Sequence, residues 1–303
     1  MESFSQKVKK ELCAKDASRE CCAGAELYGM LLFCGAFSGR GIRVSTASRP
    51  FAERFCSLFE ACGYGLAEIV SQGGGRSLIL IENRDVLARV FEAYGYDPKR
   101  QVSLHLNGWV IERECCRTAF LRGAFLSGGF VTDPEKQFRL EIITPHSALA
   151  REFSALLVDL MLDPKTTRRQ GNNVLYYKES DSISKLLGLI GAPESAALIA
   201  TASRIKGVRN MVNRRVNCEA SNIFRTVETG QSQIDNINFL IKSHLFDELS
   251  DPLKAAAELR LENPDLSLSE LTELAKPQIS RSGLNRRLQK INEFAEKNRD
   301  IFN

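Results

Sequence analysis

The chain lacks any apolar run long enough to cross a bilayer, which argues against a membrane-spanning protein. Hydrophobic residues nonetheless make up 44% of its 303 residues, enough for the buried cores of two or three domains. An excess of charge is also lacking, since the formal net charge is only +4. A weakly basic chain permits nucleic-acid binding without requiring it, so the argument must rest on where the charges lie.

Nine cysteines are present, but none of them forms a CxxC pair. The odd count and the absence of a secretory leader predict a reducing, cytoplasmic environment. Four of the nine form the dipeptides Cys21-Cys22 and Cys115-Cys116. Because neighbouring side chains diverge along a helix, we expect these thiols to be small buried hydrophobes. We therefore predict no metal site and no cofactor.

One sequence pattern occurs twice with a constant offset of 94 residues (113 − 19 and 129 − 35). The first copy is Arg19-Glu20-Cys21-Cys22 followed by Ala25, Leu27, Gly29, Leu32 and Gly35. The second copy is Arg113-Glu114-Cys115-Cys116 followed by Ala119, Leu121, Gly123, Leu126 and Gly129. This duplication predicts two repeats, at about residues 19–95 and 113–191, that are related by a pseudo-two-fold axis.

Each repeat is predicted to open with a helix of small residues, Ala25–Ala36 and Ala119–Phe130. Their glycines let two helices approach closely, so we expect them to form a central seam. Matching strand and helix periodicities follow both helices. In the first repeat these are Ile42–Ala47, a helix near Pro50–Cys62, Leu66–Val70, Leu78–Ile81 and a helix near Arg84–Ala93. In the second they are Phe138–Thr144, the helix His146–Leu162, Thr166–Arg169, Val174–Lys178 and the helix Ser182–Leu189.

The predicted fold class is therefore α+β, with a duplicated αββαββα unit in a domain over residues 1–200. An amphipathic helix is expected before the first repeat, over Met1–Ala14. Its apolar face contains Phe4, Val8 and Leu12, and its lysines, Lys7, Lys9 and Lys10, are expected off that face.

The segments Leu27–Gly35 (LYGMLLFCG) and Leu121–Gly129 (LRGAFLSGG) resemble the LAGLIDADG signature of homing endonucleases. The resemblance implies that the two helices form the seam between pseudo-symmetric halves, whose saddle-shaped sheets can lie along DNA. In that family an acidic residue at the eighth motif position of each helix holds the divalent ions that cleave DNA. Here the eighth positions are Cys34 and Gly128, and neither side chain offers an oxygen ligand. The chain is therefore predicted not to be an enzyme.

Residues 201–230 form a basic segment with few acids. Its candidate phosphate contacts are Arg204, Lys206, Arg209, Arg214 and Arg215. Arginine and asparagine both bind phosphate backbones, so the segment is either a DNA-touching linker or a solvated helix between two domains.

From Gln231 to Asn303 the pattern is purely helical. Ile234, Ile237, Ile241 and Leu245 form one apolar stripe, and Asp251-Pro252 caps and begins a second helix ending near Asn263. A capping box, Ser267 to Glu270, begins a short helix through Ala275. After a break at residues 276–278, Ser280 can cap a last helix that runs to about Ala295. This order is typical of a helix-turn-helix domain, predicted over residues 231–303.

The last helix is predicted to bind DNA with its polar side. Leu284, Leu288, Ile291 and Ala295 gather on the opposite side of a helical wheel. The candidate DNA-binding residues are Ser280, Arg281, Ser282, Asn285, Arg286, Arg287, Gln289 and Lys290. Arginine or lysine can bridge guanine, asparagine or glutamine can pair with adenine, and serine can reach base or phosphate. Arg287 lies toward the core edge, where a phosphate contact suits it better; the competing interpretation is a merely solvated basic face.

Two further segments resemble the WhiA regulators: Asn210–Asn222 is similar to their linker, and Ile279–Leu288 to their recognition helix. With the duplicated motif, the resemblance covers nearly the whole chain. It implies sequence-specific binding of double-stranded DNA, and roles in sporulation or in cell division and chromosome segregation in Gram-positive bacteria. It also implies a cytoplasmic, nucleoid-associated protein, with a protein co-regulator or the transcription machinery as a partner and no membrane.

Two alternatives stay open. The N-terminal domain, freed of catalysis, can present its saddle to a protein partner while the C-terminal domain anchors the chain to DNA. The duplicated motif also fits an active endonuclease or splicing maturase, although both missing acids oppose this.

Overall fold

The computed structural model describes residues 2–16, 19–72, 75–97 and 103–302, so the predicted end points Met1 and Asn303 lie outside the described residues. The chain divides into two compact units, Met1–Gly207 and Val208–Asn303. Within the described ranges, no helix is both long and apolar enough to span a membrane.

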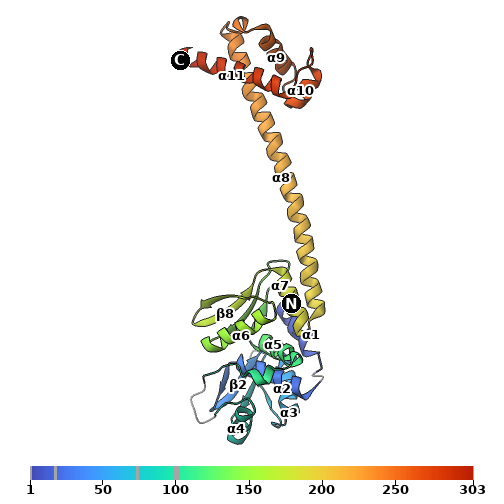
Figure 1. Ribbon diagram of the computed structural model, residues 1–303, viewed down its shortest axis with the longest axis vertical. Helices are drawn as coiled ribbons and strands as arrows, with labels where there is room; N and C mark the ends of the chain where they lie inside the picture. Colours follow the sequence, from blue (N-terminus) through green and yellow to red (C-terminus); the bar gives the residue numbers. More distant parts are fainter. Residues whose placement is uncertain (1, 17–18, 73–74, 98–102, 303) are drawn as a thin grey trace. The chain divides into compact units, whose positions relative to one another are not determined.

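The first unit contains the two predicted repeats, and each has the order αββαββα (Figure 1). The first repeat consists of α2 (Glu20–Leu32), β1 (Ala36–Ser38), β2 (Gly41–Thr46), α3 (Arg49–Ala61), β3 (Ile69–Gln72), β4 (Arg76–Ile81) and α4 (Arg84–Ala93). The second consists of α5 (Glu114–Gly128), β5 (Gly129–Val131), β6 (Leu140–Thr144), α6 (Ser147–Asp159), β7 (Lys165–Arg169), β8 (Asn172–Tyr177) and α7 (Ser180–Ile190). A 3-10 turn, η1 (Gly108–Ile111), lies between them.

Each repeat folds its strands into one antiparallel sheet, and the two sheets share a topology. The strand orders are β1-β2-β4-β3 and β5-β6-β8-β7. The first strand of each sheet is short and was not predicted, because the seam helices were expected to continue to Ala36 and Phe130. They end at Leu32 and Gly128 instead. Glycines are poor helix formers, and Gly35 and Gly129 follow these ends.

The seam helices α2 and α5 pack closely at their paired glycines. A Cβ atom on Gly29 would lie 2.2 Å from the Phe120 carbonyl oxygen, and one on Gly123 would lie 2.0 Å from that of Glu26. No side chain fits at either position without moving backbone. The repeated glycines therefore set the distance between the two halves, as the sequence predicted.

Helix α1 (Phe4–Cys13) precedes the repeats and packs on the first unit through the predicted apolar face. Val8 and Leu12 are fully buried, and Phe4 is partly buried. The prediction was wrong for Lys9, because its side chain does not lie free in solvent on the polar face of the helix. Its Nζ atom donates a hydrogen bond of 2.9 Å to the Leu126 carbonyl near the end of α5. Burial lowers the pKa of Lys9 to about 8.

Helix α8 (Pro193–Lys242) begins in the first unit and continues into the second, so residues 201–230 are helical throughout. In the second unit, η2 (Phe246–Glu248), α9 (Asp251–Glu262), α10 (Leu268–Leu274) and α11 (Arg281–Phe302) follow. The core of this unit includes Ile237 and Leu240 of α8.

Three details of the C-terminal prediction were wrong. Ile241 is 43% exposed, because the apolar row of α8 passes through Ile237 and Leu240 instead. The residue before α9 is Ser250, so Asp251 already lies in the first turn. Helix α11 also extends beyond Ala295, to Phe302.

Candidate nucleic-acid interface

Both helices of the helix-turn-helix motif, α10 and α11, begin at a serine side-chain cap. The Ser267 Oγ atom accepts a 3.4 Å hydrogen bond from the Glu270 amide, while the Glu270 carboxylate accepts one of 2.8 Å from the Ser267 amide. At the start of α11, the Ser280 Oγ atom accepts a 3.2 Å hydrogen bond from the Gly283 amide. Both predicted caps are confirmed, and they fix where α10 and α11 begin.

The buried side of α11 anchors this helix in the second core. The predicted apolar residues Leu284, Leu288, Ile291 and Ala295 are at most 1% exposed. They pack with residues of α8, α9 and α10, such as Leu240, Ala257 and Leu271. The helix therefore cannot rotate without breaking the core, and its other side is held toward solvent.

The solvent side of α11 contains most of the predicted DNA-binding residues. The exposed ones are Ser280, Arg281, Ser282, Arg286, Gln289 and Lys290. Asn285 is half-buried. Arg281, Arg286 and Lys290 have no ion-pair partner within the described part of the chain. Their charges are therefore available to a ligand, across the first three turns of the helix.

Arg287 and Ser280 differ from the other candidates because each already has a partner. The Arg287 Nη1 atom donates a 3.4 Å hydrogen bond to the Pro252 carbonyl, and the side chain is half-buried. This matches its predicted place at the core edge. The Ser280 hydroxyl caps α11 and lies 3.2 Å from the Ser282 hydroxyl, so its role in the structure is to cap the helix.

The five candidate phosphate contacts lie on α8 but are not equivalent. Lys206 is half-buried: its Nζ atom donates to the Lys136 carbonyl at 3.2 Å and lies 4.7 Å from the centre of the Phe138 ring. Arg215 pairs with Glu219 at 2.9 Å. Arg204, Arg209 and Arg214 are exposed and have no partner among the described residues. Three of the five candidates are therefore arginines without a partner among the described residues.

Neither of the two degenerate nuclease positions offers a carboxylate to a metal ion. The Cys34 thiol donates to the Leu31 carbonyl at 3.0 Å, and burial raises its pKa to about 12, so it is neutral near pH 7. A Cβ atom on Gly128 would lie 2.8 Å from the Ile143 carbonyl oxygen. An acidic side chain at this position has no room unless the backbone moves. Among the residues that the structure describes, no group of three or more carboxylates that could hold a metal ion is found.

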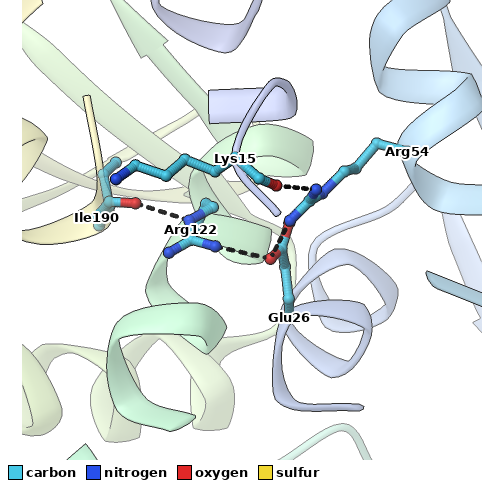
Figure 2. Close-up of polar contacts among 5 residues, drawn as sticks. All are labelled: Lys15, Glu26, Arg54, Arg122 and Ile190. Atoms are coloured by element: carbon cyan, nitrogen blue, oxygen red, sulfur yellow. Dashed lines mark hydrogen bonds and ion pairs between the residues drawn. The ribbon is translucent and has the colours of Figure 1, made fainter. Parts of the chain in front are cut away.

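A buried ionic network that the sequence analysis missed lies beside the seam (Figure 2). The fully buried Glu26 carboxylate of α2 accepts two hydrogen bonds from Arg54, at 2.9 and 2.8 Å, and one of 3.0 Å from Arg122 of α5. Arg54 also donates to the Lys15 carbonyl, and Arg122 donates to that of Ile190 at 2.7 Å. The sequence signal for this network was Glu26, a charged residue within the apolar stretch of α2.

The expectation that the paired cysteines diverge was wrong. The Sγ atoms of Cys21, Cys22, Cys115 and Cys116 all lie within 4.8 Å of one another. Within α5 the Sγ atoms of Cys115 and Cys116 are only 4.0 Å apart. The pseudo-two-fold axis also brings the first turns of α2 and α5 together. The signal was present in the sequence, since the dipeptide is itself part of the repeat.

A duplicated LAGLIDADG-like unit without metal-binding acids, joined to a helix-turn-helix unit, defines a DNA-binding class of protein. Models of two domains match the chain. The WhiA LAGLIDADG-like domain matches residues 117–209, and the WhiA C-terminal HTH domain matches residues 212–295. A probable cell division protein WhiA from Ruminiclostridium cellulolyticum is 35% identical, covering 97% of each chain. The chain therefore belongs to the WhiA family.

Solved structures agree with this assignment. The full-length WhiA protein from Thermatoga maritima is 25% identical, has a TM-score of 0.59, and is matched over 97% of this chain and 98% of its own. The N-terminal LAGLIDADG domain of a WhiA protein, at 21% identity and a TM-score of 0.52, covers 63% of this chain and 91% of its own, and supports the fold alone.

Proposed function

We propose that this protein is a sequence-specific transcription regulator that binds double-stranded DNA through α11 and acts in cell division and chromosome segregation or in sporulation. The observation that carries the proposal is the solvent side of α11. It combines unpaired arginine and lysine with serine and glutamine, on a helix whose opposite side is locked into a core. The proposal places the protein at the nucleoid, in the cytoplasm.

The residues of α11 have different proposed roles. Arg281, Arg286 and Lys290 suit guanine or phosphate, whereas Asn285 and Gln289 suit adenine. Ser282 can reach base or phosphate, and Arg287 can contact a phosphate at the edge of the motif. Ser280 orients the first turn. The domains that we propose are residues 1–200, a basic linker over 201–230 within α8, and a helix-turn-helix domain over 231–303.

The duplicated unit is proposed to be a non-catalytic derivative of a nuclease. The neutral thiol of Cys34 and the backbone packed around Gly128 support this, because hydrolysis by this fold needs carboxylates at both positions. A supercoiled plasmid incubated with the protein and magnesium should remain uncut. Nicking that depends on magnesium would contradict the proposal.

The DNA-binding proposal is tested by selecting bound fragments from a random pool, then measuring affinity for the enriched site at physiological salt. Replacing Arg286 or Asn285 by alanine should cost on the order of 1–3 kcal/mol at that site, about 5- to 150-fold in Kd, and relax its sequence preference. Lys297→Ala is the matched control, since Lys297 is an exposed basic residue later in the same helix. If the Arg286 and Asn285 variants both kept wild-type affinity and sequence preference, α11 would not be the helix that reads the DNA sequence.

A second function, docking of a protein partner, is favoured by a different surface. An apolar stripe runs along α8 within about 100° of its circumference. Its members, each at least 50% exposed, are Ile205, Val208, Val212, Val216, Ile223 and Val227. A co-regulator or a subunit of the transcription machinery can cover this stripe. A photo-crosslinking residue at position 216 should then capture a protein in cells, whereas one at position 214, off the stripe, should not.

A further inference from the structure

The four clustered thiols lie at one end of the seam, outside every surface assigned above. Cys21 and Cys22 are in the first turn of α2, and Cys115 and Cys116 are in the first turn of α5. Cys22 and Cys116 are buried, while Cys21 and Cys115 are half-buried. The Sγ atoms of Cys115 and Cys116 are 4.0 Å apart, and all four sulfurs lie within 4.8 Å of one another.

We propose that Cys21, Cys22, Cys115 and Cys116 bind one zinc ion in a tetrahedral tetrathiolate site. Zinc binds thiolate sulfur at about 2.3 Å, which sets the edge of a sulfur tetrahedron at about 3.8 Å. The four sulfurs need to approach by no more than about 1 Å to reach this geometry. A closed set of four sulfur ligands is typical of a structural zinc site, and soft thiolates select zinc over magnesium or calcium.

The surroundings suit the charge of such a site. Zinc with four thiolates has a net charge of −2, and the positive ends of two helix dipoles, those of α2 and α5, lie next to it. The residues before these helices, Arg19 and Arg113, make no side-chain cap hydrogen bond. The Arg113 guanidinium is 3.9 Å from the Cys21 sulfur and can offset part of the negative charge.

Without a metal, burial keeps the two inner thiols protonated. It raises the pKa of Cys22 to about 11 and that of Cys116 to about 12. Each thiol that is protonated beforehand releases its proton to solvent when zinc binds, so affinity rises with pH. The zinc ion remains divalent, and no oxidant or reductant is needed. The first turns of the two repeats would then be linked through one metal.

This linkage would join α2 and α5 at their N-terminal ends. The glycines bring the middle of α2 and α5 together, and the Glu26 network joins α2 to α5 through Arg122. The zinc site would add a third attachment at the start of both helices. Because metal that binds only the folded chain adds to its stability, the site would couple the folding of the two repeats. The proposed zinc site does not depend on the proposed DNA-binding function.

The test uses the full-length chain, purified under reducing conditions without added metal. Zinc is measured by elemental analysis, and the stripped protein is titrated with cobalt(II), whose spectrum reports tetrahedral thiolate ligands. Wild-type protein should hold one zinc per chain and give this spectrum. The double variant Cys21→Ser/Cys115→Ser should hold none. Cys218→Ser is the matched control, because Cys218 is an exposed cysteine on α8.

Three outcomes would overturn the proposal. Wild-type protein that holds no zinc and gives no cobalt spectrum under reducing conditions would leave the thiols as buried hydrophobes. A disulfide across the seam, found by mass spectrometry in protein trapped at lysis, would assign a redox pair instead. Zinc retained by the double variant would place the metal elsewhere. A second measurement avoids the variant, which could fail to fold: thermal unfolding of wild-type protein before and after zinc removal. The stripped protein should have the lower Tm.

Discussion

The two seam glycines are the residues on which the packing of the repeats depends most directly. Replacing Gly123 by alanine places a Cβ atom 2.0 Å from the Glu26 carbonyl oxygen, so α2 and α5 must separate. Overpacking of this kind costs about 1–3 kcal/mol, and here the obstacle is backbone. We expect a clear decrease in the free energy of unfolding, measured by denaturant titration with circular dichroism.

The control for this prediction is Gly24→Ala in α2, the other seam helix. A Cβ atom at Gly24 meets nothing within 4 Å. Alanine is the better helix former, so this variant should be neutral or up to about 1 kcal/mol more stable. If Gly123→Ala were as stable as Gly24→Ala, the close contact between the two helices would not be a determinant of stability.

Glu26 is a second residue whose replacement should be costly. It is fully buried, and it accepts hydrogen bonds from both Arg54 and Arg122, whose side chains are only 10% and 12% exposed. Glu26→Gln leaves two largely buried guanidinium groups without a compensating charge, at a cost of about 3–5 kcal/mol. The matched variant is Glu53→Gln, because the ion pair between Glu53 and Arg49 is exposed; it should cost less than about 1 kcal/mol. Equal costs in urea denaturation would contradict a structural role for Glu26.

At the scale of elements, Lys9 joins α1 to the last turn of α5 and makes this junction sensitive to pH. The pKa of Lys9 falls from 10.5 to about 8 on burial, so between these pH values the unfolded chain binds a proton that the folded chain does not. The free energy of unfolding therefore rises with pH across this window. Below pH 8 the buried charge costs up to about 3 kcal/mol, partly offset by the hydrogen bond to Leu126.

This predicts that wild-type protein gains stability relative to Lys9→Met as the pH rises from 8 toward 10.5. The difference between the two proteins is the quantity to measure, because thiols of the unfolded chain also titrate in this range. Parallel urea titrations at several pH values provide it. A constant difference would mean that Lys9 keeps its ordinary pKa in the folded state.

The elements that could be predicted are those whose signals are local. Periodicity placed α3, α4 and α7 to within a few residues, and side-chain chemistry identified the caps at Ser267 and Ser280. The short strands β1 and β5 could not be predicted in this way, since three residues are too few to show alternation.

The glycine contacts between α2 and α5 were predicted, but the polar and thiol contacts across the pseudo-two-fold axis were missed, because no local pattern encodes them. The thiol cluster requires knowing which ends of α2 and α5 meet, and the Glu26 network requires knowing what packs beside α2. The asymmetry of that network adds a difficulty: with the 94-residue offset, Glu26 corresponds to Phe120 and Arg122 to Tyr28. The duplication predicts shared backbone, and it cannot predict side chains that only one copy carries.

At the scale of the whole molecule, the internal symmetry belongs to the duplicated unit, and the helix proposed to read DNA has no share in it. The first unit has its own pseudo-two-fold axis, whereas α11 occurs once in each chain. One reader per chain fits an asymmetric DNA site, or several chains on tandem sites. Beside the phosphate contacts proposed for α11, the unpaired arginines of α8 are a second source of affinity that does not depend on sequence.

If α11 reads the sequence and α8 contacts phosphates, the salt dependence of DNA binding should follow from the arginines of α8. Each phosphate contact adds about 0.9 to the slope of log affinity against log salt concentration. Replacing Arg204, Arg209 and Arg214 together by alanine should therefore lower the magnitude of that slope by up to about 2.7 and weaken binding to all sequences equally. The replacement of Arg49, an exposed arginine of α3, should leave the slope unchanged. A triple variant that kept the slope but lost discrimination between sites would instead mean that α8 reads bases, and the assignment of specificity to α11 alone would be wrong.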